Sequence, residues 1–94
     1  MGAMTEKALQ EAILKFARQR HWLCFHTYDS RRSAPGFPDL CMVRKKRLIF
    51  AELKSEKGKL TKDQALWRET LINAGQPCYL WRPDDLEIVF KVLA

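Results

Sequence analysis

Apolar residues recur at intervals of three and four near the start of the chain, which is the pattern of a helix with one buried face. They run from Leu9 to Ala17, and Thr5 precedes them as a residue able to cap the first turn. We therefore expect a helix that begins after Thr5 and ends at about Arg20.

Two more helices are predicted in the last third of the chain. Residues 61–64 are Thr-Lys-Asp-Gln, which matches the Thr-x-x-Gln capping box, and Gly75 is a typical end for the helix that follows. Residues 83–85, Pro-Asp-Asp, begin a final helix with an apolar stripe from Leu86 to Leu93.

Four short runs have the composition of β-strands, and the two middle ones are apolar on both faces, which is typical of central strands. The tetrapeptide Arg-Lys-Lys-Arg at 44–47 separates these two and predicts a hairpin with a basic tip. The order αβββαβα indicates an α/β protein. The predicted strands are residues 22–28, 39–43, 48–54 and 78–81.

The hairpin implies a specific pairing of charged side chains. If it is symmetric about the bond between Lys45 and Lys46, Asp39 stands opposite Glu52. Like charges directly opposed in a sheet are destabilising, so such a pair indicates either an error in the assumed register or a bound cation. Mg²⁺ prefers oxygen ligands and often takes only one or two carboxylates. Lys54 lies two residues after Glu52 and therefore on the same strand face, where its ammonium could contact a phosphate or an attacking water.

The length and the net charge of the chain limit the classes of function that it can have. The chain has 94 residues, enough for one core but not two, and no apolar stretch is long enough to span a membrane. The net charge of +6 favours a polyanionic partner such as nucleic acid. Most of the surplus lies before residue 63, where 14 basic and 6 acidic residues occur. Candidate phosphate contacts are Arg31, Arg32, Lys45, Lys46, Arg47, Lys57 and Lys59.

The cysteines and the N-terminus indicate an internal compartment. The three cysteines are widely spaced, lack a Cys-x-x-Cys motif, and are expected as buried free thiols in a reducing environment. The start has no pattern of a signal peptide. We expect residues 1–4 to be a cloning remnant plus the start Met, residues 5–94 to form one domain, and the protein to be cytoplasmic in a bacterium or a phage-infected host cell.

Several short motifs together carry a family resemblance that covers nearly the whole chain. Gly-Phe-Pro-Asp at 36–39 is followed by Glu-Leu-Lys at 52–54, then Gly58-x-Leu60 and Gln64, while Glu6-x-x-Leu9-Gln10 lies in the first helix. This combination resembles the VRR-NUC family of the PD-(D/E)XK nuclease superfamily. The resemblance implies a restriction-endonuclease-like αβββαβ core, in which a central mixed four-stranded sheet is flanked by helices.

The resemblance also implies roles for individual residues. Asp39 and Glu52 would bind Mg²⁺ or Mn²⁺ together with the carbonyl of Leu53, and Lys54 would assist the nucleophile. Glu6 and Gln64 would complete the catalytic set.

Two of these roles can be compared with helix geometry. Glu6 lies about 60° from Leu9 around the first helix, whereas Glu11 lies about 160° away, so Glu6 is the acid that can face the sheet. Gln64 is also the last residue of a capping box, and its side chain could serve the helix, the site, or both.

The function implied is metal-dependent hydrolysis of DNA phosphodiester bonds. The small size and the resemblance to stand-alone family members imply a homodimer of the Holliday-junction-resolvase type acting on branched DNA, such as a four-way junction. Two alternatives stay open: a flap or nicking nuclease, and a non-catalytic nucleic-acid-binding module. The loop that carries Arg31 and Arg32 differs from the Asn-Gly-rich loop of many family members, which leaves substrate preference open.

Overall fold

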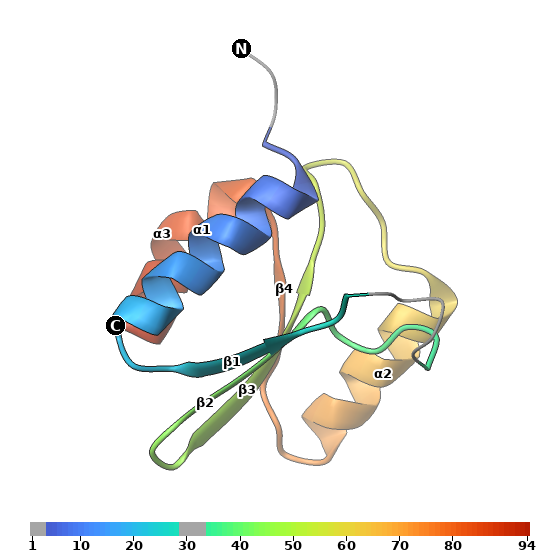
Figure 1. The fold of residues 1–94 in the computed structure, drawn as a ribbon. Coiled ribbons are helices and arrows are strands. Elements are labelled where there is room, and N and C mark those ends of the chain that lie inside the picture. Colours follow the sequence, from blue (N-terminus) through green and yellow to red (C-terminus); the bar gives the residue numbers. More distant parts are fainter. Residues whose placement is uncertain (1–3, 29–33) are drawn as a thin grey trace.

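In the computed structural model, residues 4–28 and 34–94 are described. They form a four-stranded mixed sheet in the order β1-β2-β3-β4, with helices packed around it (Figure 1). β2 is antiparallel to both of its neighbours, β1 and β3, whereas β4 runs parallel to β3. This confirms the predicted sheet and the order of elements. The bounds are α1 Glu6–Gln19, β1 Leu23–His26, β2 Leu40–Arg44, β3 Arg47–Leu53, α2 Lys62–Asn73, β4 Cys78–Trp81 and α3 Leu86–Leu93.

Helices α1 and α3 lie side by side over one part of the sheet, whereas α2 lies apart from them (Figure 1). Thr5 caps α1 as predicted, because its hydroxyl oxygen accepts a hydrogen bond of 3.0 Å from the Ala8 N–H. The apolar stripe of α1 is buried, with Leu9 and Ile13 fully inaccessible to solvent. Its burial against the sheet and α3 supplies most of the driving force that holds α1 in place.

The predicted register of the hairpin is confirmed. Leu40 pairs with Ala51 and Arg44 with Arg47, which is the pairing expected for symmetry about residues 45 and 46. Lys45 takes the left-handed conformation (φ 55°) that two-residue hairpin turns favour. One further step along the ladder brings Asp39 opposite Glu52.

The two arginines that flank the hairpin tip are anchored to the C-terminus of the chain. The guanidinium of Arg44 donates to the carbonyls of Leu93 and Ala94, and that of Arg47 donates to the carbonyl of Val92. Both lie over the ring of Trp22, at 4.7 and 5.0 Å from its centroid. The last carbonyls of α3 thus receive cationic donors.

Helix α2 contributes differently from the other two helices. Its capping box is complete, but none of its side chains is fully buried. It is held by an aromatic contact in which Trp67 meets Phe37 edge to face, and Phe37 in turn meets Phe50 of β3. Among the described residues, no helix is long and apolar enough to cross a bilayer.

Candidate functional site

Asp39 stands at the point where the β2–β3 ladder ends. Its Oδ2 atom accepts a hydrogen bond of 2.8 Å from the backbone N–H of Leu53, and its own carbonyl accepts one of 3.1 Å from the N–H of Thr27. The carboxylate therefore replaces a backbone acceptor at the end of β3. Asp39 is fixed to strands on both sides of it, and only part of its carboxylate is engaged.

Glu52 is the one charged or polar residue whose side chain is buried among the described residues, with 2% of its surface exposed. Its Oε1 accepts a hydrogen bond of 3.3 Å from Nε2 of Gln64, while Oε2 is buried with no partner in the described structure. The pKa of Glu52 is raised to about 9, mainly by burial and further by the negative charge of the neighbouring Asp39 carboxyl. Such a carboxylate needs a compensating cation to ionise at neutral pH.

Lys54 and Glu6 also influence this carboxyl group electrostatically. The positive charge of Lys54, which directly follows β3, lowers the pKa of Glu52, and the negative charge of Glu6, in the first turn of α1, raises it. Lys54 is half-buried, whereas Glu6 is exposed. Glu6 is the α1 acid whose charge affects the pKa of Glu52, and its orientation toward the site stays a prediction.

The side chain of Gln64 makes one hydrogen bond within its own helix cap and one to Glu52. Its Oε1 accepts a hydrogen bond of 2.9 Å from the N–H of Thr61 and so completes the capping box. Its Nε2 donates to Glu52. One side chain therefore caps α2 and links that helix to the buried carboxyl group.

A glycine explains how α2 comes so close to Asp39. Gly36 has φ 86°, and a Cβ atom there would lie 2.3 to 2.6 Å from backbone atoms of Asp63 and Gln64. No side chain fits at such separations, so glycine is required for both its conformation and its lack of bulk. The turn before Asp39 therefore packs directly on the first turn of α2.

Arg82 supports the loop that follows Lys54, and sequence reasoning did not single it out. Its Nη1 atom lies within hydrogen-bond distance of the carbonyl oxygens of Ser55 (2.7 Å), Glu56 (3.2 Å) and Gly58 (2.6 Å). The N–H of Lys54 donates to the carbonyl of Trp81, the residue before Arg82. The only local signal for such a role was a basic residue directly after a predicted buried strand.

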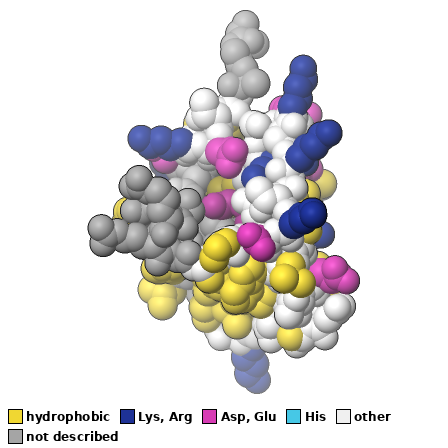
Figure 2. Space-filling model, turned by 90° about the vertical axis from the view of Figure 1, so that its right-hand side faces the viewer, with side chains coloured by type: hydrophobic (Ala, Val, Ile, Leu, Met, Phe, Trp, Pro, Cys, Tyr) yellow, Lys and Arg dark blue, Asp and Glu magenta, His cyan; other side chains and the backbone are white. Residues whose placement is uncertain are grey.

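The predicted phosphate contacts fall into three groups. Arg31 and Arg32 lie outside the described residues. Lys45, Lys46 and Arg47 lie at the hairpin tip, the end of β2 and β3 remote from Asp39 and Glu52. Lys57 and Lys59 are exposed on the loop after Lys54. The face of the molecule in Figure 2 carries acidic side chains near its centre, with Lys and Arg side chains projecting along one edge.

The chemistry of the donors fits a hard divalent cation. The partnerless Oε2 of Glu52 and the partly engaged carboxylate of Asp39 offer oxygen atoms of the kind such a cation prefers, at the same end of neighbouring strands. In residues 4–28 and 34–94, no three His, Cys, Asp or Glu side chains gather closely enough to hold a metal ion by themselves. A cation here would rely on two carboxylates, supplemented by backbone oxygen, water or substrate.

The cysteines do not contribute to this site. All three are free thiols; Cys78 is buried, while Cys24 and Cys41 are half-buried. Burial raises the pKa of Cys78 to about 11. The prediction of free thiols is confirmed, but the prediction that all three are buried holds only for Cys78, because Cys24 and Cys41 keep part of their surface exposed.

The fold is shared with solved structures of similar size. One, described as a VRR_NUC domain protein, superposes with a TM-score of 0.74 at 18% sequence identity, covering 99% of this chain and 93% of the other. A second, described as a VRR_NUC domain, has a TM-score of 0.67 at 20% identity and covers 96% of each chain.

Sequence comparison gives a consistent result. A Fanconi-associated nuclease 1 homolog from Schizosaccharomyces pombe is 38% identical over 50 residues, which are 51% of this chain and 7% of that protein. The chain thus corresponds to a small part of that relative. The model of the VRR-NUC domain matches residues 1–83, nearly nine-tenths of the sequence. Together with the matching fold, this match places the chain in the VRR-NUC domain family.

Proposed function

We propose that this protein is a nuclease that hydrolyses phosphodiester bonds of DNA with the help of a divalent cation. The observation that carries the proposal is the buried carboxyl group of Glu52, which lies beside Asp39 with one oxygen unpartnered. A buried carboxyl group beside a second acid is costly in a small protein unless a cation balances the charge. The family membership and the name of the yeast relative support the same chemistry.

Asp39 and Glu52 would hold the cation, with the carbonyl of Leu53 as a further ligand. Mg²⁺ or Mn²⁺ bound there would activate water and stabilise the charge that develops at the scissile phosphate. The hydrogen bond from the Leu53 N–H already holds the Asp39 carboxylate in one orientation. Binding of a cation to its other oxygen would therefore cost little further side-chain entropy.

The other three residues act around this pair. Lys54 would orient the attacking water and favour its deprotonated form through its positive charge. Gln64 holds Glu52 in place through its amide N–H. Glu6 would bind a water or a hydrated cation from the opposite side, since its charge is felt at Glu52 although its side chain is exposed.

We further propose that the substrate is branched DNA, such as a four-way junction, cut by a homodimer. One protomer has a single carboxylate pair, and paired incisions on a two-fold symmetric junction require two. The chain is also small for a DNA duplex to bind on one copy alone. Two alternative functions would replace this proposal: a flap or nicking nuclease, and a non-catalytic module that binds nucleic acid.

The deciding experiment is a cleavage assay on four-way junction, flap, single-stranded and duplex DNA in Mg²⁺, Mn²⁺ or EDTA. We expect cleavage of the junction in either metal and none in EDTA. Glu52→Gln and Asp39→Asn should lose at least about a hundredfold in rate, whereas Glu69→Gln, a matched change on the exposed face of α2, should not. Tight DNA binding without cleavage in either metal would identify a binding module instead.

Light scattering at assay concentration tests the oligomer separately. A mass of about two chains supports paired incision. A monomer that cuts only flaps or nicks one strand would support the first alternative.

A further inference from the structure

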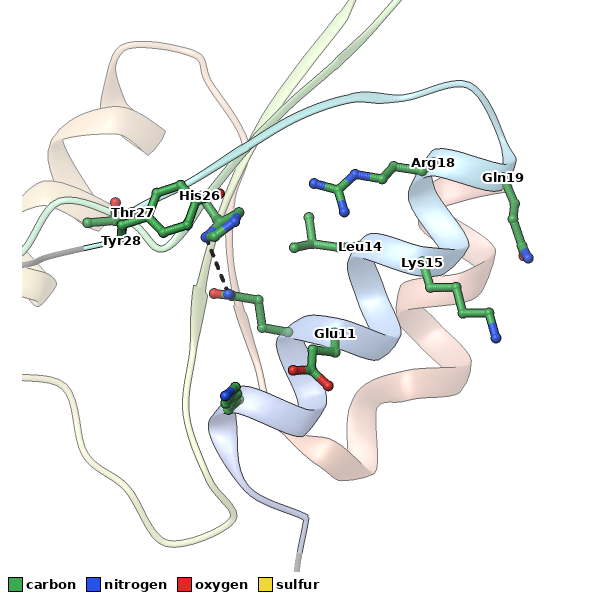
Figure 3. A pocket seen from close by; sticks show the side chains of 10 residues that line it. Glu11, Leu14, Lys15, Arg18, Gln19, His26, Thr27 and Tyr28 are labelled. Carbon is green, nitrogen blue, oxygen red and sulfur yellow. Dashed lines mark hydrogen bonds between the residues drawn. The ribbon is translucent and has the colours of Figure 1, made fainter.

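A groove of about 930 Å³ lies between α1 and the end of β1 (Figure 3). Leu14, which is almost fully buried, lines it from α1. Arg18 points from the same helix toward β1, and His26 and Tyr28 face it from the strand end (Figure 3). The catalytic proposal does not use this groove.

Two residues that line the groove are neighbours of residues in the carboxylate site. Thr27, which lines it, donates its N–H to the carbonyl of Asp39 at 3.1 Å. Gln10, at the other wall, follows Glu6 by one helical turn, so the two residues share a side of α1. Nε2 of Gln10 and Nδ1 of His26 lie 3.5 Å apart and join the walls (Figure 3). A chain molecule lying in the groove would therefore run directly past the site.

The charge of the groove suits a phosphate backbone. Lys7, Lys15 and Arg18 line it, against the single acid Glu11, and all four side chains are exposed. The basic residues extend over a stretch of α1 that is about 16 Å long at 1.5 Å per residue. Such a stretch corresponds to several nucleotides.

The groove also presents an aromatic ring. Tyr28 is 89% exposed, and its ring packs on His26 with centroids 4.2 Å apart and planes at 47°. One face of the phenol is therefore supported while its remaining surface is in water. An exposed ring next to basic residues is the arrangement that stacks unpaired nucleobases.

We propose that this groove binds an unpaired DNA strand of the substrate, with a base stacked on Tyr28 and a phosphate held by Arg18. Single-stranded DNA is favoured over duplex because a base within a duplex already has its faces covered by neighbouring bases. The inference rests on the proposed nuclease function and narrows the branched DNA substrate to one with unpaired nucleotides at the branch point, next to the cleavage point.

The test measures binding of fluorescent oligonucleotides in EDTA, so that no cleavage occurs. The probes are a single strand, a blunt duplex, and the same duplex with a single-stranded overhang. Tyr28→Ala should weaken single-strand and overhang binding by about 5- to 150-fold, and Tyr28→Phe should bind within twofold of wild type. Arg18→Ala should weaken it and reduce the slope of log affinity against log salt by about 0.7.

Two matched controls keep the result specific. Phe25→Ala removes another exposed aromatic from β1, and Lys91→Ala removes an exposed cation from α3; both should bind within twofold of wild type. The proposal is overturned if Tyr28→Ala binds single strands like wild type, or if it weakens the blunt duplex as much as the overhang. Circular dichroism of each variant separates loss of binding from loss of fold.

Cleavage by the wild type in Mn²⁺ is measured in parallel. If the wild type cleaves DNA and both Tyr28→Ala and Arg18→Ala bind single strands normally, the proposed role of the groove is overturned and the nuclease proposal stands. Loss of single-strand binding in both variants, with no cleavage by the wild type, supports the groove and overturns the nuclease proposal.

Discussion

The carboxylate of Asp39 accepts a hydrogen bond of 2.8 Å from the backbone N–H of Leu53, the residue that follows Glu52. This bond ties the end of β2 to the end of β3 and brings two acids to the same end of a pair of strands. The buried Glu52 then interacts with Gln64 of α2, so three elements converge on one carboxyl group. The predictions below test this convergence.

The close approach of Gly36 to α2 predicts a large effect of a single methyl group. Gly36→Ala should destabilise the fold by at least about 1 to 3 kcal/mol from its left-handed backbone, with a further loss because Cβ meets the backbone of Asp63. Gly75→Ala is the matched control, since Gly75 has φ 88° but open space around it. Urea denaturation should show a clearly lower midpoint for Gly36→Ala; equal midpoints would contradict the packing role.

The pKa of Glu52 predicts how stability depends on pH without metal. Because the folded-state pKa is raised to about 9, the unfolded chain loses this proton near its ordinary pKa while the folded protein keeps it. In EDTA, Glu52 should therefore reduce the free energy of unfolding progressively as the pH rises from about 5 to about 9.

The comparison is made by denaturation of wild type and Glu52→Gln across that range, with Glu69→Gln as the control. Glu52→Gln should become more stable relative to wild type as the pH increases. A difference that stays constant with pH would show that Glu52 titrates normally in the folded protein.

Arg82 is predicted to hold the loop after Lys54. Arg82→Ala leaves the carbonyls of Ser55, Glu56 and Gly58 without this donor, and should reduce the free energy of unfolding by about 1.5 to 3 kcal/mol. Amide exchange at Gly58, whose N–H donates to the carbonyl of Ser55, should accelerate more than exchange at core positions such as Ala51. Uniform acceleration across the chain would indicate only global destabilisation.

The thiols are predicted to be poorly reactive in the folded protein, and Cys78 the least. Its pKa is raised to about 11 by burial, and burial also raises the pKa values of Cys24 and Cys41. Alkylation at pH 8 followed by peptide mapping should modify Cys78 last, and all three rapidly in denaturant. Rapid alkylation of Cys78 in the folded protein would mean that β4 opens readily.

The sequence was informative where local rules decide the structure. The hairpin register followed from a basic two-residue turn, and this placed Asp39 opposite Glu52. The first helix followed from its periodic apolar face and from Thr5. Both depend on neighbours within a few residues or one strand pair.

Other features depend on contacts between distant segments. Nothing near Arg82 indicates that its guanidinium meets carbonyls 24 to 27 residues earlier. The capping box at Gln64 could be predicted from the sequence. The bond from the Gln64 side chain to Glu52 could not, because it requires the close packing of α2 that Gly36 permits. The groove likewise arises only when α1 packs beside β1.

The most direct test of the central claim is calorimetric titration of Mn²⁺ into the protein at pH 7 in two buffers of different ionisation enthalpy. Since the pKa of Glu52 is about 9 without metal, binding at Asp39 and Glu52 should release about one proton per bound ion. Glu52→Gln should lose this binding, and Glu69→Gln should retain it. Absence of binding to the wild type, or unchanged binding and proton release in Glu52→Gln, would contradict the assignment of the carboxylate pair as the metal site.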